Sequence, residues 1–284
     1  MVFEEIIVNQ FLQSYATPLL TEAFKAITYF GNPAVWVIIA AWLFWIGKER
    51  KSFVVMSIML FCGVIAGGLK ILIARPRPTE VIALVIETSP AFPSAHSTLM
   101  AAYAIYGWLS KWVQKYLKYL LIILTILVGI SRLYLGVHYL SDVLAGLLIG
   151  GIIGRIVIKL ESKIDKINFH ISKIQDEFLA IIFFILMLIL YFFVPEQYHA
   201  GFTILGYFAG YSIYRHTKIN LDLKKSKSLK LTIISIIIGT GLLGAMGYIA
   251  LKNPNIYGDT LFFIAGIFMT VIWPLVIQKF IQKK

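Results

Sequence analysis

Three short stretches of the sequence carry side chains of the kinds that bind and transfer an anion. They are KILIARPRP (70–78), PSAHS (93–97) and SRLYLGVHYLSD (131–142). Each lies at the edge of an apolar run, so the polar residues are predicted at helix ends. The candidate residues in these stretches are Lys70, Arg77, Ser94, His96, Ser131, Arg132, His138 and Asp142.

The first stretch offers two cations seven residues apart, Lys70 and Arg77. Pro76 and Pro78 stop a helix and stiffen the chain that leaves it. An ammonium and a guanidinium held there can bind a tetrahedral oxyanion. The alternative is that these cations only extend to the membrane surface from a helix end. Arg75 is a further cation, whose direction the sequence does not determine.

The second stretch opens a predicted helix. The first turn of a helix presents unpaired backbone N–H groups, and the helix dipole favours an anion there. Ser94 is predicted to cap this helix, and His96 lies within its first turn, where the ring can reach a bound anion. The alternative is a capping serine beside a histidine at the membrane interface, with no part in catalysis.

The third stretch places a histidine and an acid on one helical face. His138 and Asp142 are spaced i, i+4, which puts their Cβ atoms about 6 Å apart. A carboxylate hydrogen-bonded to one ring nitrogen fixes the tautomer and raises the basicity of the other nitrogen. This arrangement is typical of a nucleophilic or basic histidine. The alternative is a pair that only fastens the helix end.

Long apolar runs must position these three stretches. The chain of 284 residues is 59% hydrophobic and 14% charged, with a mean hydropathy of +0.83. About nine runs approach the roughly 17–25 apolar residues that cross the hydrocarbon core of a bilayer. We therefore predict an all-α, polytopic helical membrane protein. The runs lie at 33–47, 53–74, 97–112, 116–135, 139–158, 178–195, 200–214, 231–251 and 260–278.

Residues 2–28 differ from these runs because they carry several charged and amide side chains. They are predicted to form an amphipathic helix in the membrane interface rather than a cleavable signal peptide. The alternative is a first true span. The single cysteine, Cys62, lies in an apolar run and offers neither an intrachain disulfide nor a metal cluster.

The net charge of +12 is distributed as in a multi-pass membrane protein. Twenty of the 26 Lys and Arg residues fall in five connections, which alternate with connections nearly free of positive charge. This pattern places the basic connections in the cytoplasm and the three polar stretches on the extracytoplasmic side. Binding of nucleic acid is therefore not expected. The basic connections are Lys48–Lys51, Lys111–Lys118, Arg155–Lys173, Arg215–Lys230 and Lys279–Lys284.

The three stretches together resemble a known signature. K-x6-RP, PSAH and SR-x5-H-x3-D look like the three-part motif of the type 2 phosphatidic acid phosphatase family, which vanadium-dependent haloperoxidases and glucose-6-phosphatase share. The resemblance covers about residues 50–155. It implies a six-helix phosphatase core, followed here by additional C-terminal transmembrane helices.

The resemblance also implies which residues bind phosphate. Lys70, Arg77 and Arg132 would bind the phosphate oxygens and stabilise the charge of the pentacoordinate transition state. Ser94 and nearby backbone N–H groups would add donors. Ser131 would either donate to an oxygen or hold the loop. Because three fixed cations supply the electrostatic stabilisation, no metal and no other cofactor is expected.

The remaining residues would carry out the chemistry. His138 would attack phosphorus and form a phosphohistidine, while Asp142 orients its ring. His96 would protonate the leaving alkoxide and then help to activate water. The implied function is a lipid phosphate phosphatase that hydrolyses a phosphomonoester or a diphosphate. The alternatives are a lipid phosphotransferase that uses the same phosphohistidine, and a transporter or scaffold that retains the fold without activity.

The predicted organisation has three parts. Residues 1–160 form the phosphatase core with its interfacial helix, 161–177 an amphipathic cytoplasmic linker, and 178–284 C-terminal transmembrane helices. These last helices are predicted to serve as a packing annex, an oligomerisation surface for homo-oligomers or a docking site. The expected partners are the bilayer and a lipid phosphate substrate. The expected location is the plasma membrane, with the active site facing outward.

Overall fold

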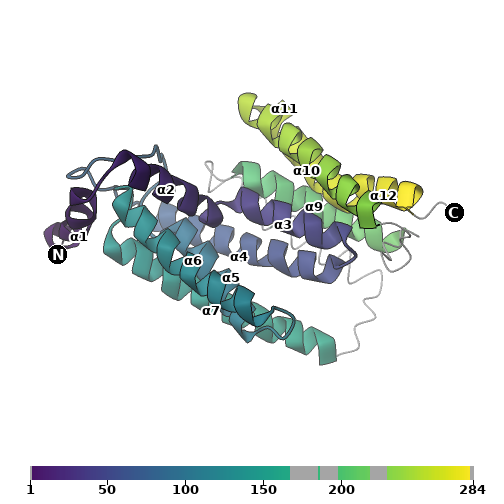
Figure 1. The fold of residues 1–284 in the computed structure, drawn as a ribbon, viewed down its shortest axis with the longest axis horizontal. Helices are drawn as coiled ribbons and strands as arrows, with labels where there is room; N and C mark the ends of the chain where they lie inside the picture. Colours follow the sequence, from purple (N-terminus) through teal and green to yellow (C-terminus); the bar gives the residue numbers. More distant parts are fainter. Residues whose placement is uncertain (1, 167–184, 186–197, 218–228, 282–284) are drawn as a thin grey trace. The chain divides into compact units, whose positions relative to one another are not determined.

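The computed structural model describes residues 2–166, 185, 198–217 and 229–281, and this part of the chain is helical with no strand. The chain forms two compact units, and Figure 1 shows its helices in order along the sequence. The first unit comprises residues 1–35 and 58–169, and the second comprises 36–57 and 170–284. The expected all-α fold is confirmed.

The N-terminal segment forms two helices rather than the single amphipathic helix that was predicted over 2–28. Helix α1 spans Val2–Ser14, and α2 spans Pro18–Thr28. The break arises because Thr17 caps α2, where its hydroxyl accepts a hydrogen bond of 3.2 Å from the backbone N–H of Leu20. Helices of this length are too short to cross a bilayer alone, which weighs against the alternative of one straight first span.

Long apolar helices follow. Five helical stretches of the described residues are long and apolar enough to cross a membrane, or six if α2 with the 3₁₀ turn η1 (Tyr29–Gly31) and α3 (Pro33–Trp45) count as one bent span. The predicted run 97–112 corresponds to α5, a helix of only 15 residues. The predicted run 178–195 lies outside the described residues except for position 185. The five stretches are Glu49–Ile73 (α4), Lys115–Tyr134 (α6), Leu140–Ser162 (part of α7, Leu140–Lys166), Lys230–Lys252 (in α10, Leu229–Lys252) and Ile256–Lys279.

In the first unit, α7 packs against α5 (Ala95–Leu109) through a row of glycines. Gly146, Gly150 and Gly154 are spaced by four, so they share one face of α7. A Cβ added at Gly150 would lie 2.0 Å from the carbonyl oxygen of Thr98, and those at the other two would lie 2.7 Å and 2.4 Å from α5-side carbonyl oxygens. The glycines therefore allow the two backbones to approach closely, as small residues do in membrane helices.

The close approach can be tested with a single methyl group. Gly150→Ala is expected to lower the free energy of unfolding by about 1–3 kcal/mol, because the α5 backbone must move to admit the new Cβ. Gly151→Ala is the matched control, since a Cβ there meets only Ile105 Cγ1 at 3.7 Å. Unfolding in detergent measures both. Equal stability of the two variants would contradict this packing.

The second unit contains α9 (Tyr198–His216), α10, α11 (Ile256–Ile267), the π-helical turn η3 (Phe268–Ile272) and α12 (Trp273–Ile281). A π turn leaves carbonyl groups free for other donors. Within this turn the carbonyl of Met269 accepts a hydrogen bond of 2.9 Å from the buried Trp45 indole.

Residues 36–57 thus cluster with the C-terminal helices, although the sequence prediction included them in 1–160. The start of the predicted linker, 161–166, continues α7, and the rest of the linker lies outside the described residues. The three-part division and the oligomerisation surface stay predictions.

Candidate active site

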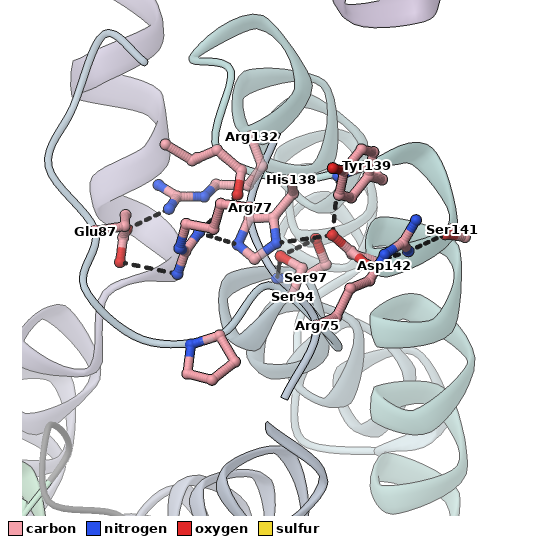
Figure 2. Close-up of polar contacts among 12 residues, drawn as sticks. Arg75, Arg77, Glu87, Ser94, Ser97, Arg132, His138, Tyr139, Ser141 and Asp142 are labelled. Carbon is pink, nitrogen blue, oxygen red and sulfur yellow. Dashed lines mark hydrogen bonds and ion pairs between the residues drawn. The ribbon is translucent and has the colours of Figure 1, made fainter. Parts of the chain in front are cut away.

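The three sequence stretches meet at one end of the helices of the first unit (Figure 2). Helix α4 ends at Ile73, and Ala74 adopts a left-handed conformation with φ of 47°. Pro76 and Pro78 keep the following chain out of helix. An extended segment directs alternate side chains to the same side. Arg75 and Arg77 accordingly both reach towards the connection between α6 and α7.

Arg77 lies beside the candidate nucleophile. Its Nη1 donates a hydrogen bond of 2.6 Å to the carbonyl of Val137 and lies 3.4 Å from Nε2 of His138. Its Nε donates to the carbonyl of Ser89 over 2.7 Å. The guanidinium is therefore fixed by backbone oxygens on both sides, next to the ring nitrogen that would form the bond to phosphorus.

The other two cations are buried and reach the same place. Lys70 donates to the Ser89 hydroxyl over 3.1 Å and to the carbonyl of Pro90. Arg132 donates to the hydroxyl of Thr28 over 3.0 Å and to the carboxylate of Glu87. The predicted cation cluster is thus assembled, and oxygens from the loop between α4 and α5 are bound to it.

Ser94, His96 and Ser131 differ in how close they lie to the cations and in what they bind. Ser94 caps α5 as predicted, and its Oγ accepts from Ser97 Oγ over 3.0 Å. The charges of Arg132, Lys70 and Arg77 act on His96, which therefore lies near the three cations. The Ser131 hydroxyl instead donates to the carbonyl of Val128 in its own helix over 2.6 Å, so it does not point to the cations.

His138 is almost fully buried and has two distinct ring nitrogens. Nε2 faces Arg77, and Nδ1 lies 3.4 Å from Asp142 Oδ2. Nδ1 has no hydrogen-bond partner among the described residues. The predicted hydrogen bond between His138 and Asp142 is therefore not formed, although the two groups are within ion-pair distance. Burial and the charges of Arg132 and Arg77 hold the pKa of His138 well below its usual range. The ring is therefore neutral near pH 7, as a nucleophile requires.

Asp142 fixes the start of α7. Its Oδ2 accepts a hydrogen bond of 2.9 Å from the backbone N–H of Tyr139, and its Oδ1 accepts one of 2.7 Å from Arg75. The carboxylate is fully buried, and its Arg75 partner supplies the charge that such a position requires. Asp142 thus fastens the helix end and lies beside His138, and its role in orienting that ring stays a prediction.

Helix α1 contributes to this network. Glu5 accepts hydrogen bonds of 3.1 Å and 2.6 Å from the N–H and hydroxyl of Ser141 and lies 3.5 Å from Arg75. Burial raises the pKa of Glu5, but the Ser141 hydrogen bonds and the Arg75 charge outweigh it and lower the pKa overall. Asn9 donates to the carbonyls of Leu133 and His138 over 2.8 Å and 3.0 Å. The helix therefore holds the backbone on which His138 lies.

Sequence reasoning missed four contributors to the site. Glu5 and Asn9 are spaced i, i+4, which is a signal that they share one face of α1. Glu87 and Ser89 lie in an irregular loop, where no periodic pattern indicates them. In the described residues no group of three or more His, Cys, Asp or Glu side chains has the arrangement of a metal site.

Comparison with known proteins gives a consistent set of relatives. A family model described as the PAP2 superfamily matches residues 51–166. Phosphatidylglycerophosphatase B of Bacillus subtilis is 32% identical over 163 residues, which is 52% of this chain and 79% of that protein. An undecaprenyl-diphosphatase of Sulfolobus acidocaldarius is 29% identical over 142 residues, which is 48% of this chain and 68% of that protein.

A solved structure supports the same assignment. The crystal structure of a transmembrane PAP2-type phosphatidylglycerolphosphate phosphatase from Bacillus subtilis is similar, with a TM-score of 0.51 and 28% identity. The similarity covers 57% of this chain and 86% of that one.

Spanning helices and relatives named as phosphatases define the class: the protein is a multi-pass integral membrane enzyme, a lipid phosphatase that hydrolyses phosphate esters. The chain belongs to the PAP2 superfamily, which confirms the family resemblance of the three motifs. The family match ends at residue 166, so the C-terminal helices lie outside it.

Proposed function

We propose that this enzyme hydrolyses the terminal phosphate of a lipid phosphomonoester or diphosphate through a phosphohistidine at His138. The observation that carries the proposal is the position of His138 Nε2, which lies 3.4 Å from Nη1 of Arg77, in a ring on which the charges of Arg132 and Lys70 also act. The relatives are named for phosphatidylglycerophosphate and undecaprenyl diphosphate, both lipids with a terminal phosphate group. We therefore propose that the substrates are lipids with a terminal phosphate group.

In the proposed first step, Nε2 of neutral His138 attacks phosphorus and forms a P–N bond. The P–O bond to the lipid breaks, and its electron pair goes to the leaving oxygen, which takes a proton from His96. Lys70, Arg77 and Arg132 bind the three equatorial oxygens as negative charge accumulates on them. Asp142 balances the positive charge that develops on the ring.

In the second step, water attacks the phosphohistidine. His96 takes a proton from the water, the P–N bond breaks, and its electron pair returns to Nε2. Inorganic phosphate is the product. The three side chains that supply positive charge here act where a divalent metal acts in other phosphoryl-transfer enzymes. We therefore propose that the reaction is independent of metal ions.

The proposed orientation puts the active site on the extracytoplasmic side of the plasma membrane. Helices α5, α6 and α7 alternate in direction, and the candidate site lies at the start of α5 and α7 and at the end of α6. The opposite ends of these helices are joined to the connections rich in positive charge, Lys111–Lys118 and Arg155–Lys173. The positive-inside rule places those connections in the cytoplasm. A lipid substrate can then enter from the outer leaflet with its tail in the bilayer.

Release of inorganic phosphate from a panel of lipid phosphates and diphosphates tests these proposals together. Activity is expected to be undiminished in EDTA and to be inhibited by vanadate, which mimics the pentacoordinate transition state. In sealed right-side-out vesicles, vanadate added only outside is expected to inhibit fully. Strict loss of activity in EDTA, or full activity in vanadate, would contradict the mechanism. Phosphorylated acceptor lipid in place of free phosphate would identify a phosphotransferase.

A further inference from the structure

Glu87 occupies a position that has no role in the proposed reaction. Its carboxylate accepts a hydrogen bond from Nη2 of Arg132 and lies 3.6 Å from Nη2 of Arg77 (Figure 2). These are two of the three cations that the proposed function assigns to the phosphate oxygens. A carboxylate and a phosphate present similar oxygen pairs to a guanidinium, and both bind it in the same geometry. Glu87 therefore binds the donors that a substrate phosphate needs.

The loop that carries Glu87 is held on both sides of this residue. The backbone N–H of Leu84 donates to the carbonyl of Leu135 over 3.0 Å, and that of Ala91 donates to the carbonyl of Arg75 over 2.8 Å. The side chain of Glu87 is 26% exposed, whereas that of Arg132 is 2% exposed. The carboxylate is thus the more exposed partner of this pair. It can turn away into water while both ends of the loop stay in place.

The charges explain why an acid is present there. Lys70 and Arg132 are both buried, and Arg77 lies close to them, so the site without substrate would gather three cations in a poorly hydrated place. Like charges crowded away from water are costly unless an anion compensates them. Glu87 provides that anion from within the chain. A phosphate dianion entering the site would supply the same compensation and would make Glu87 redundant.

We infer that Glu87 is the counter-ion of Arg77 and Arg132 before substrate binds and competes with the substrate phosphate for them, so that it sets the affinity of the site for phosphate. The inference rests on the proposed function. A ligand that binds only when Glu87 has left has its apparent affinity reduced by the fraction of molecules in the open state. This reduction is a property of the protein and is the same for every phosphate-like ligand.

The test is Glu87→Gln, which keeps the shape of the side chain and removes its charge. The KM for a lipid phosphate and the inhibition constants of inorganic phosphate and of vanadate are all expected to fall by one common factor, about tenfold. The rate constant of the first turnover at saturating substrate is expected to stay unchanged, because Glu87 is absent from the occupied site. A common factor distinguishes this competition from a change in the contacts of one ligand.

Glu80→Gln is the matched control. Glu80 is exposed, lies on the same loop, and accepts a hydrogen bond from the adjacent Thr79 N–H. It loses the same charge, so a long-range electrostatic effect would lower the three constants equally in both variants and would overturn the inference. A raised KM in Glu87→Gln would also overturn it, because Glu87 would then hold Arg132 in place for the substrate.

The failure of this inference differs from the failure of the proposed function. If His138→Ala abolishes turnover and Glu87→Gln leaves all three constants unchanged, only the role of Glu87 is wrong. If His138→Ala retains turnover, the phosphohistidine proposal itself is wrong.

Discussion

His138→Ala is expected to abolish turnover, with a loss of at least about 10⁴-fold in kcat. The reason is that the imidazole would form the bond to phosphorus, since its Nε2 lies 3.4 Å from Nη1 of Arg77, one of the cations proposed to bind the phosphate. Quenched samples of the wild-type enzyme with radiolabelled substrate are expected to contain a protein-bound phosphate that is labile in acid and stable in alkali, as a P–N bond is. The alanine variant is expected to contain none.

The control for this experiment is His216→Ala, which removes an exposed imidazole at the end of α9 in the second unit. It is expected to keep the wild-type rate and the labelled intermediate. Activity of His138→Ala within tenfold of wild type would show that the chemistry takes place elsewhere.

His96→Ala is expected to have the second largest effect, and the size of the effect should depend on the leaving group. Hydrolysis of a lipid phosphomonoester, whose alkoxide needs a proton, is expected to fall by about 10²–10⁴-fold. An aryl phosphate with an acidic phenol needs no such proton, so release of the phenol in the first turnover is expected to be nearly unchanged. Rapid-quench measurement of that first turnover separates protonation of the leaving group from the later attack by water.

An equal loss for both substrates in the first turnover would exclude His96 as the proton donor. It would indicate instead that His96 only supports the packing around it. A variant that disturbs only this packing is available for comparison. A Cβ added at Gly31 would lie 2.8 Å from the Cβ and Cδ2 atoms of His96. Gly31→Ala would therefore displace the ring without removing it, and its effect should be similar for both substrates.

The sequence predicted the helical fold from local signals, whereas the convergence of its motifs was implied by the family resemblance. Apolar runs indicate spanning helices, and the fixed spacings within the motifs place Lys70, Arg77 and Arg132 at helix ends. The short α5 was also predicted at nearly its observed length, but its ends were not. Its end at Leu109 comes before the predicted limit of 112, because Ser110 adopts an extended conformation at the C-terminus of the helix.

Features that depend on contacts between distant segments could not be predicted. The direction of Arg75 is fixed by Asp142 and Glu5, which lie 67 and 70 residues away in the sequence. The geometry of His138 and Asp142 departs from a simple hydrogen bond because Asp142 binds the Tyr139 N–H and Arg75 instead. The spacing of two residues determines the face they share, but not which of several donors an acid prefers.

The irregular loop between α4 and α5 was the least predictable part of the site. Its residues have neither a helical nor a strand period, so Glu87 and Ser89 look like ordinary surface residues in the sequence. Their importance follows only from the positions of the cations that bind them. Ser131 shows the opposite case, since it belongs to a motif, yet its hydroxyl is bound to Val128 of its own helix.

The hydrogen bond from Asn9 to the carbonyl of His138 joins residues 129 positions apart, and it has a consequence for biosynthesis. The ribosome releases α1 long before the third motif is made, so the Asn9 amide has neither of its carbonyl partners, Leu133 and His138, during that interval. The catalytic centre is completed only when the connection between α6 and α7 has emerged and docked against that helix. A ribosome-bound chain arrested before residue 138 therefore lacks both the proposed nucleophile and the carbonyl that Asn9 binds.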